Sequence, residues 1–207
     1  MWFLAIEPLS SLTHAIPTND QHDLYAHCLG SVLSDLGIRA EDGDADALFE
    51  HGLLLLHGHC VRENQSAGLL RLKTAAAKGH IEAAFVLGDL YADKSLRQLH
   101  DPNKAHQYLL FAAENNHLPA QHILGIILVR GDLGKDQQHH GLYWLGVAAS
   151  QRHGLSAIIM GHLREHGKYG IEQDPCLARD WYELCLMLGM HEAIKFIQVI
   201  DTTHTCN

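Results

Sequence analysis

The chain has 207 residues, which is long enough to bury a hydrophobic core without disulfide bonds to hold it. Hydrophobic residues make up 47% of the sequence and charged residues 19%, a composition that excludes a disordered chain. There are 15 Lys and Arg against 24 Asp and Glu, so the formal net charge is −9 with His neutral. This negative charge disfavours a nucleic-acid partner.

The first residues do not resemble a secretory signal or a membrane anchor. The apolar stretch at residues 2–6 has no Lys or Arg before it and is interrupted by Glu7. The longest later apolar stretches, residues 53–56 and 123–129, are far shorter than the roughly 20 residues that a membrane-spanning helix needs. We therefore expect no membrane span.

The cysteines are few and odd in number. None of them forms a C-x-x-C pair, so their spacing indicates neither a disulfide framework nor a zinc knuckle. We predict reduced thiols and a cytoplasmic location, with Cys185 buried as a small apolar side chain. The five residues are Cys28, Cys60, Cys176, Cys185 and Cys206.

Residues 1–46 precede the regular part of the chain. Within them, residues 19–37 have helical spacing and predict one helix. We expect this helix to cap the element that follows, and it stays open whether residues 1–46 cap a binding groove or fill it.

From residue 47 onward the sequence repeats every 36 or 37 residues. Glycines recur at intervals of 36, 37 and 36, at Gly52, Gly88, Gly125 and Gly161. Further small residues follow in step, at Ala75, Ala112, Ala148 and Cys185. Two marks that each recur four times in phase predict a repeat architecture.

Each period contains two apolar segments with helical spacing. Residues 83–91 and 121–129 predict first helices of a hairpin, and residues 104–116 predict a second helix. Small residues at fixed positions allow the two helices to approach closely. Because one hairpin cannot bury its apolar face alone, the hairpins are expected to stack.

Residues that start and stop helices agree with this register. Asp-Pro pairs predict helix starts at Asp101 and Asp174, since proline suits the first helical position. Gly79, Gly189 and Asn116 stand where a helix ends in a left-handed residue. Arg152 departs from this pattern.

The repeated order resembles the Sel1-like repeat family, relatives of the tetratricopeptide repeats. The unit that follows the family order best contains Leu87-Gly88, Tyr91, Asp101, Lys104-Ala105, Tyr108-Leu109, Ala112-Ala113 and Ala120. The resemblance implies an all-α fold, a right-handed α-α superhelix of about four helical hairpins with capping helices at both ends. We predict an N-terminal segment at 1–46, repeats at 47–82, 83–119, 120–155 and 156–192, and a C-terminal capping helix and tail at 193–207.

The same resemblance implies a non-enzymatic scaffold or adaptor that binds a protein or peptide on a concave face lined by the first helix of each hairpin, without a cofactor. Fold alone does not establish such a function. If the hairpins stack as in tetratricopeptide arrays, the face grades from apolar to ionisable. Its members would be Phe49, Leu53, Leu56, His57, Phe85, Asp89, Asp93, His122, Ile126, Arg130, Ile158, His162, Glu165 and His166. Alternatively, Phe49, Leu53 and Phe85 are covered by the N-terminal segment.

One segment formally matches a zinc-peptidase pattern, H-x-x-E-H at residues 162–166. Histidines four residues apart share a helix face and can bind one zinc ion, and Glu165 would act as a base. No third ligand is indicated, so the pair His162 and His166 is a weak metal candidate. A metal-dependent hydrolase, or a metal- or pH-responsive binder, is the alternative function.

Histidine is abundant, with 18 residues scattered along the chain. The simplest explanation of this abundance is compositional drift, in which the histidines have no shared role. The alternative is a pH sensor, since each neutral histidine gains a proton near pH 6.5 unless its pKa is shifted.

Overall fold

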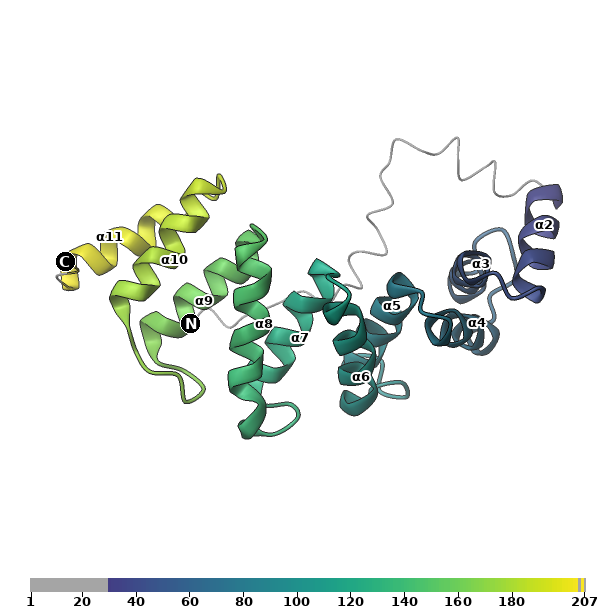
Figure 1. The fold of residues 1–207 in the computed structure, drawn as a ribbon, viewed down its shortest axis with the longest axis horizontal. Coiled ribbons are helices and arrows are strands. Elements are labelled where there is room, and N and C mark those ends of the chain that lie inside the picture. The colour runs from purple at the N-terminus through teal and green to yellow at the C-terminus, as the bar shows by residue number, and fades with distance from the viewer. Residues whose placement is uncertain (1–29, 205, 207) are drawn as a thin grey trace. The chain divides into compact units, whose positions relative to one another are not determined.

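The computed structural model describes residues 30–204 and 206, and every regular element among them is a helix (Figure 1). The predicted all-α fold of helical hairpins is therefore confirmed. The chain divides into two compact units, Met1–Asp101 and Pro102–Asn207. Within the described part of the chain, no helix is long and apolar enough to cross a membrane.

The described part of the first unit contains four helices. Helices α3 and α4 pack as a hairpin, with α2 against α3 and α5 against α4. Their bounds are α2 (Gly30–Glu41), α3 (Ala45–His57), α4 (Gln65–Ala77) and α5 (Ile81–Ala92). Helix α2 overlaps the capping helix predicted at 19–37, of which residues 19–29 lie outside the described residues.

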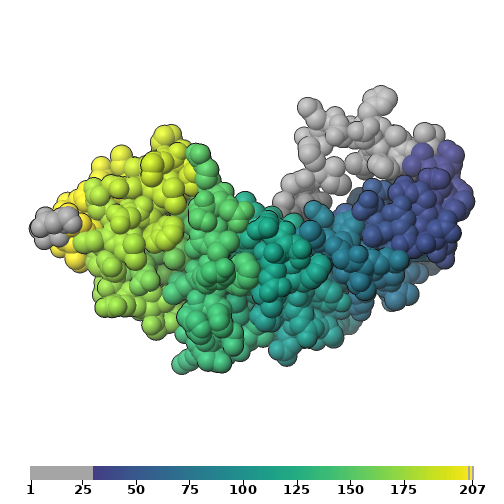
Figure 2. All heavy atoms as spheres, viewed as in Figure 1, coloured from purple at the N-terminus to yellow at the C-terminus, as the bar shows by residue number. Residues whose placement is uncertain are grey.

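The second unit contains six α-helices among its described residues. Helices α7 and α8 form one hairpin and α9 and α10 the next, while α6 packs on α7 and α11 on α10. Side chains fill the space between α8, α9, α10 and α11, which run from green to yellow in Figure 2. The bounds are α6 (Pro102–Glu114), α7 (Leu118–Arg130), α8 (Gln138–Ser150), α9 (Gly154–His166), α10 (Pro175–Met187) and α11 (Ala193–Thr203), with a short 3-10 helix η2 (Lys135–Gln137) before α8.

Small residues stand where the two helices of a hairpin cross. A Cβ atom added to Gly141 of α8 would lie 2.6 Å from the backbone nitrogen of Val129 and 2.7 Å from the carbonyl oxygen of Gly125, both on α7. Gly68 of α4 is equally close to the backbone of Gly52 on α3, at 2.8 Å. The second small-residue series, Ala75, Ala112, Ala148 and Cys185, is fully buried. The predicted close approach of the paired helices is therefore present in both units.

Histidines cap the starts of three first helices, a feature that the sequence analysis missed. His80, His117 and His153 each accept, through Nδ1, the backbone N–H of the residue three positions later, at 3.1, 3.2 and 3.3 Å. An accepting Nδ1 carries no proton, so each of these rings is neutral in this arrangement. Histidine is not among the usual capping residues, so the sequence alone does not predict these caps.

The other helix ends lie at the start and stop residues that the sequence predicts. Asp174 caps α10 by accepting the backbone N–H of Leu177 at 2.9 Å, with proline next. Gly79, Gly189 and Asn116 adopt positive φ values, as predicted. Arg152, the exception in the sequence pattern, is held in the same region at φ 67°.

The cysteines correct the prediction of reduced thiols. Cys176, at the start of α10, forms a disulfide with Cys206, and Cys60 is also disulfide-bonded. Because α10 and α11 are antiparallel, the start of one and the end of the other meet, with the two Cα atoms 5.3 Å apart across a sequence separation of 30. Only Cys185 is a free thiol among the described residues, and it is buried, as predicted.

We expect peptide mapping of the unreduced full chain to recover one linked peptide that joins Cys176 to Cys206, because the fold brings these residues within bonding distance. Alkylation after denaturation should label Cys185 in the same sample, and a reduced sample serves as the control. Recovery of Cys176 and Cys206 as separately alkylated peptides from the unreduced chain would contradict the pairing.

Candidate functional site

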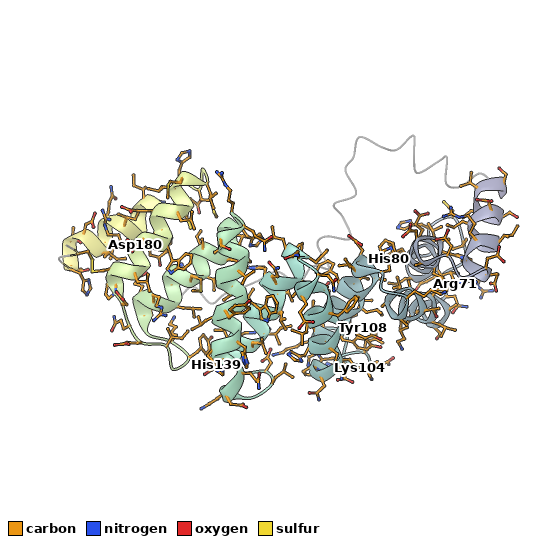
Figure 3. The ribbon with its side chains drawn as sticks, in the orientation of Figure 1. Arg71, His80, Lys104, Tyr108, His139 and Asp180 are labelled. Atoms are coloured by element: carbon orange, nitrogen blue, oxygen red, sulfur yellow. A yellow bond between two sulfur atoms is a disulfide. The ribbon has the colours of Figure 1, made fainter. Side chains whose placement is uncertain are left out.

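The predicted face of α3 consists of side chains that are partly covered. Phe49, Leu53 and Leu56 are half-buried, and His57 is exposed at the last position of the helix. The ring of Phe49 stacks on the capping ring of His80, with centroids 4.5 Å apart. Figure 3 labels His80 at the start of α5. The first unit therefore joins its two first helices through an aromatic contact.

The face of α5 carries two carboxylates beyond a phenylalanine. Phe85 and Asp89 lie one turn apart on α5, Asp93 is the C-cap residue whose backbone N–H donates to the carbonyl oxygen of Asp89, and all three are half-buried. Burial, together with a smaller effect of the negative charge of Asp93, raises the pKa of Asp89 to about 6. Asp93 accepts the backbone N–H of Ser95 at 2.7 Å. The charged form of Asp89 is therefore disfavoured in the free protein.

The residues predicted on α7 differ in their exposure to solvent. Ile126 is only 7% exposed and lies in a core cluster with Leu145 and Met160, so its assignment to a binding face is wrong. Arg130 is exposed, and its guanidinium donates to Asp132 at 3.2 Å.

His122, the third predicted residue of α7, belongs to a polar contact between α7 and α9. Its Nδ1 lies 2.8 Å from Oγ of the buried Ser156, whose hydroxyl is 2.9 Å from Nδ1 of His153. The two imidazole rings have centroids 4.5 Å apart. Burial, together with a smaller repulsion from His153, lowers the pKa of His122 to about 4. His122 is therefore uncharged at neutral pH.

The last turn of α9 brings three predicted residues together. We call His162, Glu165 and His166 the His-Glu cluster. Oε2 of Glu165 lies 3.7 Å from Nδ1 of His162 and 3.8 Å from Nδ1 of His166. Within residues 30–204 and 206, this is the one group of three His, Cys, Asp or Glu side chains whose possible ligand atoms all lie within 4.8 Å of one another. Ile158, one turn before His162, packs against the core instead.

Two residues that sequence reasoning missed complete this site. The hydroxyl of Tyr182 on α10 donates to Oε2 of Glu165 at 2.7 Å and lies 2.9 Å from Nδ1 of His162. Phe196 on α11 contacts His162 edge-on at 4.7 Å and stacks on Tyr182 at 5.0 Å. Tyr182 stands where the best-matching repeat has Leu109, so the repeat order does not predict this hydrogen bond.

The electrostatics of the site follow from its burial. Burial lowers the pKa of His162, although the carboxylate of Glu165 opposes this shift. Burial also raises the pKa of Tyr182, and its hydrogen bond to Glu165 raises that pKa further. At neutral pH the site therefore combines an uncharged His162 with a tyrosine that keeps its proton.

Comparisons with known proteins agree with the hairpin architecture. The model of the Sel1 repeat matches residues 45–80, 81–117, 118–153 and 155–189. A protective antigen of uropathogenic Escherichia coli strains, which displays an SLR fold, is 26% identical with a TM-score of 0.65, over 76% of this chain and 33% of that protein. A Sel1 repeat protein from Oxalobacter formigenes is 21% identical with a TM-score of 0.62, over 75% of this chain and 62% of that protein.

This chain thus spans about a third of the length of the first of these proteins and less than two thirds of the second. A search of curated proteins found no match. The four matched repeats cover more than half of the chain, and three of them coincide with the helical hairpins α3–α4, α7–α8 and α9–α10. The chain therefore belongs to the Sel1 repeat family, whose members are typically scaffolds for protein-protein interaction.

Proposed function

We propose that the chain is a non-enzymatic scaffold that binds a protein or peptide through side chains of its first helices. The observation that carries the proposal is the half-buried carboxylate of Asp89 on α5, whose raised pKa means that its negative charge destabilises the free protein. A cationic group on a partner would remove that penalty by pairing with the carboxylate.

The surroundings of Asp89 indicate the kind of partner. Asp93 lies one helical turn beyond it and Phe85 one turn before it, so two carboxylates and an aromatic ring lie in one row. A Lys or Arg side chain would meet the two carboxylates, and a neighbouring apolar side chain would pack on Phe85. We therefore propose a peptide segment with a basic residue beside an apolar one.

The experiment is selection from a random peptide library displayed on phage, with the full chain immobilised. We expect the wild type to enrich peptides that pair a Lys or Arg with an apolar residue, and D89N to bind them at least about tenfold more weakly, the cost of one charge-assisted bond. The matched control is E82Q, which removes an exposed carboxylate from the same helix. Unchanged binding by D89N would contradict the proposal.

The same variant has an opposite expected effect on stability. An aspartate with a folded-state pKa of about 6 and an ordinary value of 3.8 costs stability above pH 6, because the unfolded chain ionises more readily. D89N should therefore raise the free energy of unfolding at pH 7 by about 1–3 kcal/mol. Urea denaturation measures this change and shows that weaker peptide binding does not arise from unfolding.

We propose no catalytic role for the H-x-x-E-H segment. A hydrolase would need Glu165 as a base, but Oε2 of this carboxylate already accepts the hydroxyl of Tyr182, which leaves only its other oxygen. The adaptor function needs no reaction at this site.

The cytoplasmic location predicted from the sequence stays a prediction. The bonded cysteines favour a different compartment. Disulfides persist mainly in oxidising compartments. Because Cys176 is paired with Cys206 and Cys60 is also bonded, we propose that the scaffold works in such a compartment.

A further inference from the structure

We propose that the His-Glu cluster binds one divalent transition-metal ion of the zinc class, through Nε2 of His162, Nε2 of His166 and the carboxylate of Glu165. Tyr182 would act as the residue that positions these ligands. This site is separate from the peptide-binding face proposed on α5. It extends the weak metal candidate of the sequence, the pair His162 and His166, by a third ligand and a positioning residue.

The first argument is the proton position on His166. Its Nδ1 lies 3.1 Å from the carbonyl oxygen of His162, and a carbonyl oxygen only accepts hydrogen bonds. Nδ1 must therefore carry the proton, which leaves Nε2 of the neutral ring with a free lone pair. A histidine whose other nitrogen donates to a backbone carbonyl is the usual arrangement of a metal ligand.

The same reasoning applies to His162 through Tyr182. Since the tyrosine hydroxyl donates its proton to Oε2 of Glu165, its oxygen accepts from Nδ1 of His162. The chain of donors runs from His162 to Tyr182 to Glu165, and it again leaves Nε2 of the histidine free. Both rings are thus held in the same tautomer, and one carboxylate oxygen of Glu165 is not needed by Tyr182.

The spacing of the two rings suits one shared ion. Histidines four residues apart lie on one helix face, and their ring centroids here are 6.1 Å apart. Two Nε2 ligands of a tetrahedral zinc ion place the centroids roughly 5 Å apart, from zinc-nitrogen bonds of about 2 Å. His166 is exposed at the end of α9, so a metal ion would need only a small rotation of this side chain to close the difference.

The position on the helix also favours a cation. The cluster occupies the last turn of α9, which ends at His166. Carbonyl groups without helical partners give this end a partial negative charge, and Glu165 adds a full one. The aromatic rings of Phe196 and Tyr182 pack edge-on against the ring of His162, which restricts the positions that His162 can take.

Imidazole and carboxylate together select ions such as Zn²⁺, Co²⁺ or Ni²⁺ rather than Mg²⁺ or Ca²⁺. Three protein ligands leave at least one coordination position for water or for a side chain of a bound protein. The site is therefore open to completion by a partner that supplies a histidine or a carboxylate.

The test is calorimetric titration of the chelator-treated full chain with ZnCl₂, together with Co²⁺ absorption spectra. We expect one ion per chain at this site, with the visible bands of Co²⁺ bound to nitrogen. The variants E165Q and H166A should each weaken binding by about tenfold or more. Y182F should also weaken it, because the tautomer of His162 loses its support, while the helical content stays unchanged.

The matched control is the double variant H139A/H140A, which removes two exposed neighbouring histidines from α8 (His139 is labelled in Figure 3). It should bind Zn²⁺ as the wild type does. Retention of the ion by E165Q and H166A would overturn the proposal, as would its loss in H139A/H140A alone. In the wild type, ring proton resonances of His162 and His166 should shift on addition of Zn²⁺, and unshifted resonances would also overturn it.

Discussion

Replacement of Gly141 by alanine should lower the free energy of unfolding of the second unit by about 2–4 kcal/mol. The added Cβ atom would lie 2.6 Å from the backbone nitrogen of Val129 and 2.7 Å from the carbonyl oxygen of Gly125. Both are backbone atoms, so relief requires α7 and α8 to move apart rather than one side chain to turn. This cost exceeds the roughly 1 kcal/mol that alanine gains over glycine within a helix.

Gly146 provides the matched control on the same helix. A Cβ atom added there meets no heavy atom within 4 Å, so G146A should stabilise the protein by about 0.5–1 kcal/mol. Urea denaturation, followed by circular dichroism, measures both variants. In thermal melts G141A should unfold roughly 5–15 °C below the wild type. Equal stability of the two variants would contradict the close approach of α7 and α8.

Acidification should destabilise the protein through His122. Its pKa is about 4 in the folded chain and close to 6.5 when unfolded, so between these values the unfolded chain binds the extra proton. Stability is therefore retained above pH 6.5 and lost as the pH falls toward 4. Between pH 7 and pH 5 this group alone should lower the free energy of unfolding by about 2 kcal/mol.

The variant H122Q isolates this effect. Glutamine can keep a hydrogen bond to Ser156 but does not titrate, so the loss of stability between pH 7 and pH 5 should shrink by about 2 kcal/mol. His191 is exposed, and H191Q should follow the wild-type profile. Urea denaturation at several pH values gives these profiles. Parallel profiles for H122Q and the wild type would contradict a buried, uncharged His122.

The repeat was predictable because its marks are local and recur. Glycines every 36 or 37 residues and the Asp174-Pro175 start depend on backbone geometry within one hairpin, and the structure places helix crossings and a helix start there. A single sequence was sufficient to predict the repeat, since the same small residues recur at the same positions in each unit.

Side-chain orientation on α7 was less predictable. Residues 123–129 are apolar except for Gly125, so no polar residue marks the solvent side of this segment. The structure buries residues 124–129. Ile126 could not be assigned to a surface by periodicity alone.

Contacts between residues that are distant in sequence could not be predicted either. The bond from Cys176 to Cys206 depends on how α10 and α11 fold back on each other, and the hydrogen bond from Tyr182 to Glu165 depends on the packing of α10 against α9. Spacing rules for cysteines describe neighbours in sequence, so they do not detect such a pair.

The disulfide between Cys176 and Cys206 also limits how far α11 can separate from α10 in a local opening. Helices of repeat proteins can open locally, because each repeat contacts only its neighbours. Here Cys206 is tied to Cys176 at the start of α10, which keeps the end of α11 beside that helix. Phe196 lies on α11 and covers His162. A reducing agent would release this tether, so hydrogen exchange in α11 and water access to His162 should increase together.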